Sequence, residues 1–267
     1  MSQVFNVLII GGKGNIGSGL RTYLPRLDRR YQFVSVDLPG AEDKATEKDV
    51  PGQLIDLDIM ADQEKFKNLV GGKNLVIYLA RKSPLDEMNR MTDYVFETVQ
   101  AQEIPPMILA ASSVHAVDDA YHFLQHGAYA QIADRQFDEI EFWPEPIPAT
   151  LPACPLNDYG HEKAYVESWC KQLAKNGISA IAARWGGINA RNSAIADEPG
   201  YFTVWCHQQD AARFVHSCFV SHLICQLPSG AHYFVISNNT YGIFDIETPK
   251  REVGYEPVHN AESFYAP

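Results

Sequence analysis

Short, almost wholly apolar runs alternate with longer amphipathic stretches in the first part of the chain. The run at residues 4–10 (VFNVLII) leads directly into a glycine-rich loop, which is typical of a parallel strand buried on both faces. Apolar side chains then recur at helical spacing at Ile16, Leu20, Tyr23, Leu24 and Leu27. Residues 33–37 (FVSVD) form the next apolar run, so the pattern predicts one strand–helix–strand unit.

The same alternation continues further along the chain. Strands are predicted at residues 53–58, 74–79 and 107–111, with helices at residues 62–70 and 85–103 between them. Strands and helices that alternate in this way predict an α/β fold with a doubly wound parallel sheet, the Rossmann architecture.

The regular pattern breaks at residues 118–155, whose prolines, acids and aromatics predict a long surface excursion beside a site. It resumes with a helix that Asn157 or Asp158 can cap, followed by a strand at residues 178–184. We therefore expect residues 1–184, excursion included, to be mainly a nucleotide-binding domain. Residues 185–267 are expected to form mainly a small, interleaved C-terminal substrate cap, with some elements that return to the core.

Charge and cysteine usage narrow the class of partner. Asp and Glu number 33 against 22 Lys and Arg, and the formal net charge of −11 repels nucleic acid and anionic membrane surfaces. The five cysteines are scattered without C-x-x-C spacing, so neither a disulfide framework nor a metal site is indicated. Since the sequence shows no signal peptide and no apolar run of about 20 residues, we expect a cytoplasmic protein that acts on small molecules, without membrane or nucleic-acid partners.

Three glycines at G-x-x-G-x-x-G spacing follow the first predicted strand and open the first helix. Glycine lets the backbone turn tightly and approach a pyrophosphate at a helix N-terminus, where unpaired N–H groups favour negative charge. We expect this loop to bind the phosphates of a dinucleotide through Gly11, Gly14, Asn15, Ile16 and Gly17. A tight turn without a ligand is the alternative.

Acidic residues close the second and third predicted strands. Asp37 lies about twenty residues beyond the glycine loop, where a carboxylate accepts hydrogen bonds from the adenosine ribose and repels a 2′-phosphate. This position favours NAD over NADP. Either Asp56 or Asp58 could bond the adenine amino group, with Asp58 preferred, and solvated turn acids are the alternative for all three. The expected cofactor contacts also include Ile59, Leu79 and Ala80.

Tyr159 and Lys163 are four residues apart and therefore share one face of the predicted helix. A free tyrosine titrates near pH ~10, and a neighbouring cation lowers that pKa, so that the phenolate can take a proton from a substrate hydroxyl. Ser113 lies at the carboxyl edge of the sheet, where it can hydrogen-bond the reacting oxygen. A Tyr-x-x-x-Lys spacing alone is more often a surface pair, but after a complete nucleotide-binding half it predicts a catalytic set.

These motifs resemble the extended short-chain dehydrogenase/reductase family over most of the sequence. The matching features are, in order along the chain, the glycine loop, Asp37, Ser113 and Tyr159-x-x-x-Lys163. Within that family, the chain is most similar to the NAD-dependent uronate dehydrogenases, in its compact length and in the Ser-Ser-x-His pattern at residues 112–115. The likeness continues at Ser83, at residues 184–186 (RWG), in the segment 205–219 with its acid Asp210, and in the tail 253–257 (VGYEP).

The resemblance implies oxidation of the anomeric hydroxyl of a sugar acid to a lactone, with formation of NADH. Tyr159 would be the general base, Ser113 the partner that polarises the hydroxyl, and Lys163 the cation that tunes Tyr159 and contacts the nicotinamide ribose. Contacts with the substrate are implied for Ser83, Ser113, His115, Tyr159 and Arg184, the last as a bidentate clamp on the carboxylate.

Purely structural roles are the alternative for the residues expected to contact the substrate. His115 could bond a loop carbonyl, Ser83 could cap the next helix, and Arg184 could pair with one of the many acids. Val114 stands where the family has Asn, which removes an amide that recognises hydroxyl groups.

Two other functions and one assembly state are compatible with the sequence. A nucleotide-sugar epimerase or dehydratase would retain its NAD and reuse the hydride, and a regulator would bind NAD without turnover. The resemblance alone implies a homodimer or higher homo-oligomer.

Overall fold

The fold is described from a computed structural model, which describes residues 4–47, 50–121 and 127–265. Seven strands of this part of the chain form one sheet in the order β3-β2-β1-β4-β5-β6-β7, and every neighbouring pair is parallel. The strands are β1 Phe5–Ile10, β2 Tyr31–Asp37, β3 Gln53–Asp56, β4 Leu75–Tyr78, β5 Met107–Ser113, β6 Ala180–Trp185 and β7 His232–Val235. The strand order reverses beside β1, which confirms the predicted doubly wound α/β sheet.

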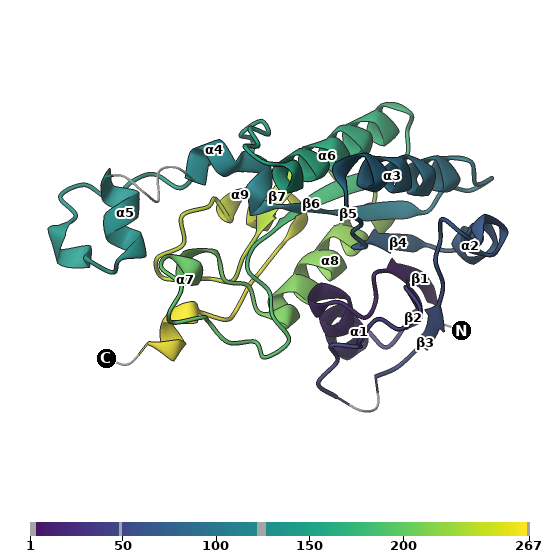
Figure 1. Cartoon of the computed structure of the whole chain (residues 1–267), viewed down its shortest axis with the longest axis horizontal. Helices are drawn as coiled ribbons and strands as arrows, with labels where there is room; N and C mark the ends of the chain where they lie inside the picture. Colours follow the sequence, from purple (N-terminus) through teal and green to yellow (C-terminus); the bar gives the residue numbers. More distant parts are fainter. Residues whose placement is uncertain (1–3, 48–49, 122–126, 266–267) are drawn as a thin grey trace.

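Helices cover both faces of the sheet (Figure 1). On one side lie α1 (Asn15–Leu27) and α8 (Gln208–Leu223); on the other lie α2 (Gln63–Val70), α3 (Leu85–Gln100) and α6 (Asp158–Lys175). Alternate residues of β1 point to opposite faces of the sheet. Val7 and Ile9 pack with α1 and α8 on one face. Leu8 and Ile10 pack with α2, α3 and α6 on the other. Burial on both faces explains why β1 reads as an uninterrupted apolar run.

The predicted elements occur with small shifts at their ends. β3 ends at Asp56, two residues earlier than expected, and Asp58 instead accepts a hydrogen bond from the backbone N–H of Met60 at 2.9 Å. Asn157, one of the two candidate caps of α6, accepts from the N–H of Gly160 at 2.9 Å. A side chain that bonds its own backbone in this way sets an element boundary that apolar periodicity does not mark.

The excursion after β5 contains short helices rather than only irregular chain. They are the 3-10 helix η1 (Val114–Val117), α4 (Asp118–Tyr121), α5 (Gly127–Ala133) and η3 (Phe137–Glu139). Residues 122–126 of the predicted excursion lie outside the described residues. The helix α5 stands away from the sheet (Figure 1), and the segment returns where the N–H of Ile147 donates to the carbonyl of Ile243 at 2.8 Å.

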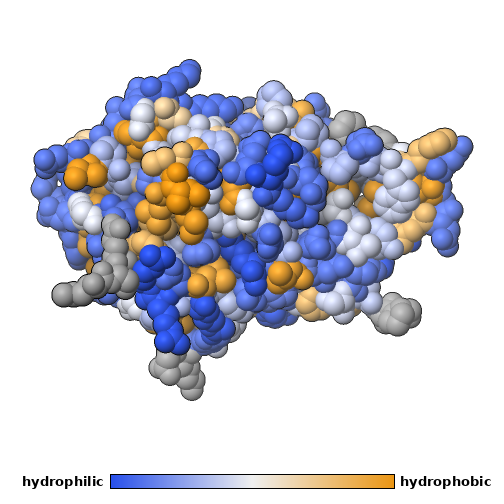
Figure 2. Space-filling model, turned by 180° about the vertical axis from the view of Figure 1, so that it is seen from behind, coloured by the Kyte–Doolittle hydropathy of each residue, from blue (hydrophilic) through white to orange (hydrophobic). Residues whose placement is uncertain are grey.

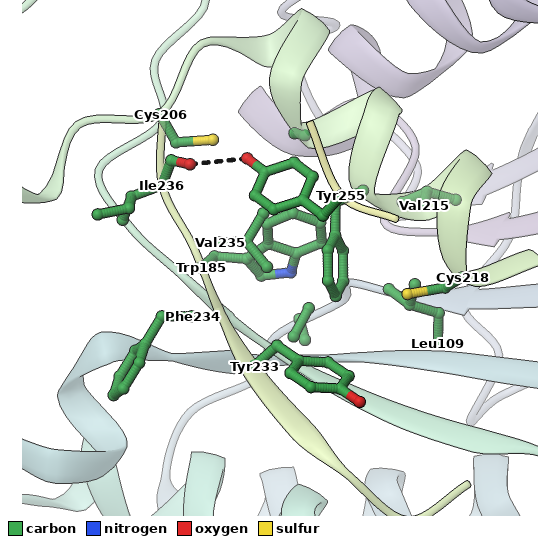
Figure 3. Packing of buried hydrophobic residues seen from close by; sticks show 14 of the residues in the cluster. Leu109, Trp185, Cys206, Val215, Cys218, Tyr233, Phe234, Val235, Ile236 and Tyr255 are labelled. Atoms are coloured by element: carbon green, nitrogen blue, oxygen red, sulfur yellow. Dashed lines mark hydrogen bonds between the residues drawn. The ribbon is translucent and has the colours of Figure 1, made fainter. Parts of the chain in front are cut away.

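The chain after β6 adds both to the two layers and to the surface. It contributes β7 and α8 to the layers, and the shorter helices α7 (Tyr201–Val204), α9 (Glu247–Val253) and η4 (Ala261–Phe264) outside them. The tail that follows α9 inserts Tyr255 beside Trp185 of β6 (Figure 3). The hydroxyl of Tyr255 donates to the carbonyl of Ile236 at 2.7 Å, so the tail is tied to the chain just beyond β7.

On the face shown in Figure 2, the surface is mostly hydrophilic and the hydrophobic residues form several separate groups. Among the described residues, no helix has the length and apolar character needed to cross a membrane.

Candidate active site

Two cavities adjoin at the carboxyl edge of the sheet, where the strand order reverses and where ligands bind in open α/β folds. The first measures about 540 Å³ and the second about 250 Å³. Gly11, Gly14, Leu79 and Arg81 line both of them, so the glycine loop and the end of β4 form the junction.

The glycine loop provides a close backbone approach to the first cavity. Gly11 has a φ of +91°, and a Cβ there would lie 2.8 Å from the backbone nitrogen of Ala80. At Gly17 a Cβ would lie 2.4 Å from the carbonyl oxygen of Gly11. Gly14 is the N-cap of α1 and has no side chain to bond the first-turn N–H groups, which have no acceptor within the helix. This cradle fits the pyrophosphate of a dinucleotide.

The second cavity lies between the ends of β2 and β4. Five of the residues expected to contact the cofactor line this cavity: Asp37, Asp58, Ile59, Leu79 and Ala80. Asp37 accepts hydrogen bonds from the backbone N–H groups of Lys13 at 2.8 Å and Leu38 at 2.9 Å, which hold its carboxylate at the end of β2.

Asp56 and Asp58 have different surroundings. Asp56 pairs with the ammonium of Lys13 at 2.6 Å, and only Asp58 lines the second cavity. The backbone register explains the difference, since Asp56 is still in strand β3 whereas Asp58 lies in the turn that follows it.

Ser113, Tyr159 and Lys163 all line the first cavity. Ser113 is the last residue of β5, and the other two lie in the first turns of α6. The ammonium of Lys163 lies 5.2 Å from the centre of the Tyr159 ring. The hydrogen-bond donors and the proton acceptor of the expected catalytic set are therefore brought together, from elements about fifty residues apart in sequence.

Burial governs the ionisation of this set. It raises the pKa of Tyr159 above its ordinary value of 10.0, and the side-chain hydrogen bond with Ser113 opposes that rise. Burial also lowers the pKa of Lys163, while the neighbouring Glu162 carboxylate opposes the fall. In the free protein, desolvation of the phenolate therefore outweighs the nearby charges, and the pKa of Tyr159 is raised.

A network of side chains fixes the start of α6 against the end of β5. Asp118 receives a hydrogen bond from the amide of Asn157 at 2.6 Å, and the Nδ1 of His115 lies 2.8 Å from its other oxygen. Gly160 allows close packing here, since a Cβ would lie 2.5 Å from the carbonyl oxygen of His115. The ring of His115 meets the ring of Tyr159 edge to face at 5.4 Å. His115 lines the first cavity, as a substrate contact requires.

Two residues that were expected to contact the substrate line neither cavity. Arg184 is fully buried, and its guanidinium donates to both oxygens of Glu167, at 2.7 and 2.9 Å, and to the carbonyl of Leu151 at 2.9 Å. Since it lines neither cavity, the expected carboxylate clamp is corrected to a buried ion pair. Ser83 is exposed and also lines neither cavity, and the N-cap of α3 is Pro84 rather than Ser83.

The structure brings three further charged residues to this region. Arg81 lines both cavities, and the buried Glu162 accepts its Nε–H at 2.9 Å. Glu198 lines the first cavity from the chain before α7. Glu162 lies within the Tyr-x-x-x-Lys motif, so its position next to Lys163 could have indicated a place in the site. Nothing in the sequence marks Glu198 as a site residue.

A model of the NAD dependent epimerase/dehydratase family matches residues 7–190. The matched part includes the glycine loop, the two acids that line the second cavity and the residues of the expected catalytic set. No curated protein sequence matches the chain.

Solved structures share the fold at low sequence identity. A uronate dehydrogenase variant from Agrobacterium tumefaciens, complexed with NAD, is 17% identical with a TM-score of 0.70, over 98% of this chain and 87% of that one. A dTDP-glucose 4,6-dehydratase from Bacillus anthracis, in complex with NAD, is 13% identical with a TM-score of 0.64, over 97% and 93%. A UDP-glucose 4-epimerase from Brucella ovis, in complex with NAD, is 14% identical with a TM-score of 0.61, over 98% of each chain.

Proposed function

Because the chain belongs to the NAD dependent epimerase/dehydratase family, we propose that it is an oxidoreductase that uses NAD to oxidise a hydroxyl group of a sugar or sugar acid. The observation that carries the proposal is the meeting of Ser113, Tyr159 and Lys163 on the wall of a cavity that adjoins the acidic adenosine-sized cavity. A base beside a dinucleotide groove is the arrangement that coupled removal of a proton and a hydride needs.

The residues of the groove fit NAD. The backbone N–H groups at the start of α1 would hold the pyrophosphate, Asp37 the adenosine ribose and Asp58 the adenine. NAD supplies, when bound, the acceptor for a hydride. The negative charge of Asp37 disfavours the 2′-phosphate of NADP, so the preference for NAD is expected to come from this carboxylate.

The protein's own residues handle the proton. Tyr159, as phenolate, accepts the proton of the substrate hydroxyl, while Ser113 hydrogen-bonds the same oxygen and Lys163 stabilises the anionic base. The substrate carbon loses its hydrogen with the bonding pair, and a carbon–oxygen double bond forms. At an anomeric carbon the product is a lactone, and the proton then leaves Tyr159 to solvent.

The wall that faces the catalytic set restricts the substrate. It contains Glu198 and Tyr201, whose oxygens can accept or donate hydrogen bonds to sugar hydroxyls. The likeness to a uronate dehydrogenase supports a sugar acid, but Arg184 does not reach the cavity to hold its carboxylate. Both uronic acids and neutral aldoses therefore belong in the first substrate panel.

The test is NADH formation by the purified protein with NAD, and then with NADP, across uronic acids, the matching neutral aldoses and a nucleotide sugar. We expect NADH to accumulate in proportion to the sugar consumed, with NAD as the preferred cofactor. An isomerised nucleotide sugar without net NADH would instead favour a retained-cofactor epimerase. Tight binding of NAD without turnover of any sugar would favour a regulator.

A further inference from the structure

Three charged side chains gather beside Tyr159, two from α6 and one from the loop after β4. The side chain of Glu162 is 2% exposed, and its Oε1 lies 2.9 Å from the Nε of Arg81 and 3.1 Å from the ammonium of Lys163. A carboxylate at this depth persists in its charged form only with such partners. Glu162 itself lines neither cavity, so it acts through its neighbours and not on a ligand.

Arg81 occupies the face of the Tyr159 ring. Its guanidinium carbon lies 4.7 Å from the ring centre, close to the 5.2 Å that separates the ammonium of Lys163 from the same centre. Glu162 offsets the charge of Lys163, which it contacts directly. The trio therefore keeps one net positive charge beside the phenol only because Arg81 is present.

We propose that Arg81 and Glu162 form a positioning pair for the base: Glu162 holds Arg81 over the Tyr159 ring and offsets Lys163, and Arg81 restores the positive charge that favours the phenolate. The proposal rests on the proposed role of Tyr159 as base. It assigns no contact with substrate to Glu162.

The remaining polar groups that face Tyr159 come from β5 and the segment after it. They are Ser113, His115 and Asp118, of which Asp118 is anionic and raises the pKa of Tyr159. Within the trio, Glu162 raises that pKa and Arg81 lowers it, in agreement with the geometry. The same two directions hold for Lys163: Glu162 raises its pKa and Arg81 lowers it.

The experiment measures the ionisation of Tyr159 in the free protein, without turnover. The ring Cζ carbons of all tyrosines are labelled with ¹³C, the Tyr159 signal is assigned by its absence in Tyr159→Phe, and its phenolate fraction is followed at alkaline pH. The variants are Arg81→Gln, Glu162→Gln and the double variant. Arg90→Gln, which removes an exposed cation of α3, is the matched control.

The variants are expected to shift the ionisation in opposite directions. Arg81→Gln should lower the phenolate-to-phenol ratio at a given pH by about tenfold or more, as loss of a cation within 4–6 Å does. Glu162→Gln should raise the ratio, because the amide oxygen of Gln can still accept the Nε–H of Arg81 while the negative charge is gone. The double variant should lie between the two single variants, since it loses one charge of each sign, and Arg90→Gln should change nothing.

A merely structural role for the pair predicts no such reversal and cancellation. Shifts of the same sign in the two single variants overturn the proposal. So does the absence of a shift in Arg81→Gln, which replaces a side chain that is 52% exposed. Because the readout needs no substrate, it separates this proposal from the proposed function. If no sugar in the panel is turned over, the proposed function is contradicted, but the titration result for Tyr159 remains valid.

Discussion

Tyr159 is the residue on which the proposed chemistry depends most directly. Tyr159→Phe keeps the ring between His115 and Arg81 but removes the group that accepts the proton. We expect NADH formation to fall by about 10²- to 10⁴-fold, the usual contribution of general acid–base catalysis, with NAD affinity unchanged. Steady-state rates and calorimetric NAD titration check this. Tyr165→Phe, in the same helix but bonded to Asp93, is the control, and equal rates for both variants would contradict the role of Tyr159.

Arg184 is the residue for which sequence and tertiary structure disagree most. Its replacement leaves the buried Glu167 carboxylate without its main partner, although Ser112 still donates to it at 2.7 Å. Arg184→Met is expected to lower the free energy of unfolding by about 3–5 kcal/mol, the cost of an uncompensated buried charge. Urea denaturation measures the loss. Combining it with Glu167→Gln should recover part of the stability, whereas a simple sum of the two losses would argue against coupling.

Among the elements, β1, the glycine loop and α1 are those whose sequence pattern and structure agree most closely. Local requirements determine them: an apolar run for a strand buried on both faces, glycines where backbone meets backbone, and helical periodicity up to Leu27. The end of β3 and the short helices after β5 were not predictable in the same way. They depend on side-chain bonds such as those of Asp58 and Asp118, made with particular neighbours.

The tail after α9 carries one fully buried tyrosine. Tyr255 is fully buried, and its hydroxyl satisfies the carbonyl of Ile236 (Figure 3). Tyr255→Phe should lower the free energy of unfolding by about 1–2 kcal/mol, because that carbonyl is left buried without its donor. The measurement is the midpoint of urea denaturation, compared with that of the control Tyr94→Phe. This control removes a hydroxyl-to-carbonyl hydrogen bond of 2.9 Å at the exposed surface. A loss as large in the control would show that burial is not the cause.

At the scale of the whole molecule, partly buried histidines make stability depend on pH. Burial lowers the pKa of His207 and of His232 from 6.5 to about 4, in His207 with help from the stacked His259. Since the folded state disfavours their protonation, their contribution is complete above pH 6.5 and is lost as pH falls toward 4.

Urea midpoints measured across that range should therefore fall steadily toward acid. The variant His207→Asn/His232→Gln should show a shallower fall, because Asn still provides an N-cap for α8 and neither new side chain titrates. An unchanged slope in this variant would contradict the assignment. The carboxyl groups of Asp245 and Glu167, whose pKa values are lowered from 3.8 and 4.5, add a loss at the acid end of this range, and that loss is common to the wild type and the variant.

The sequence by itself determined the order of strands and helices, the doubly wound sheet, the glycine cradle and the residue types of the catalytic set. These depend on local periodicity and on the chain direction of parallel strands, which brings their carboxyl ends to one edge. Only the tertiary structure decided which charges meet there. Arg184 lies near the end of β6 and Arg81 lies just after β4, yet one is paired with Glu167 and the other faces Tyr159. The difference arises because side-chain direction and partner burial depend on residues far away in sequence.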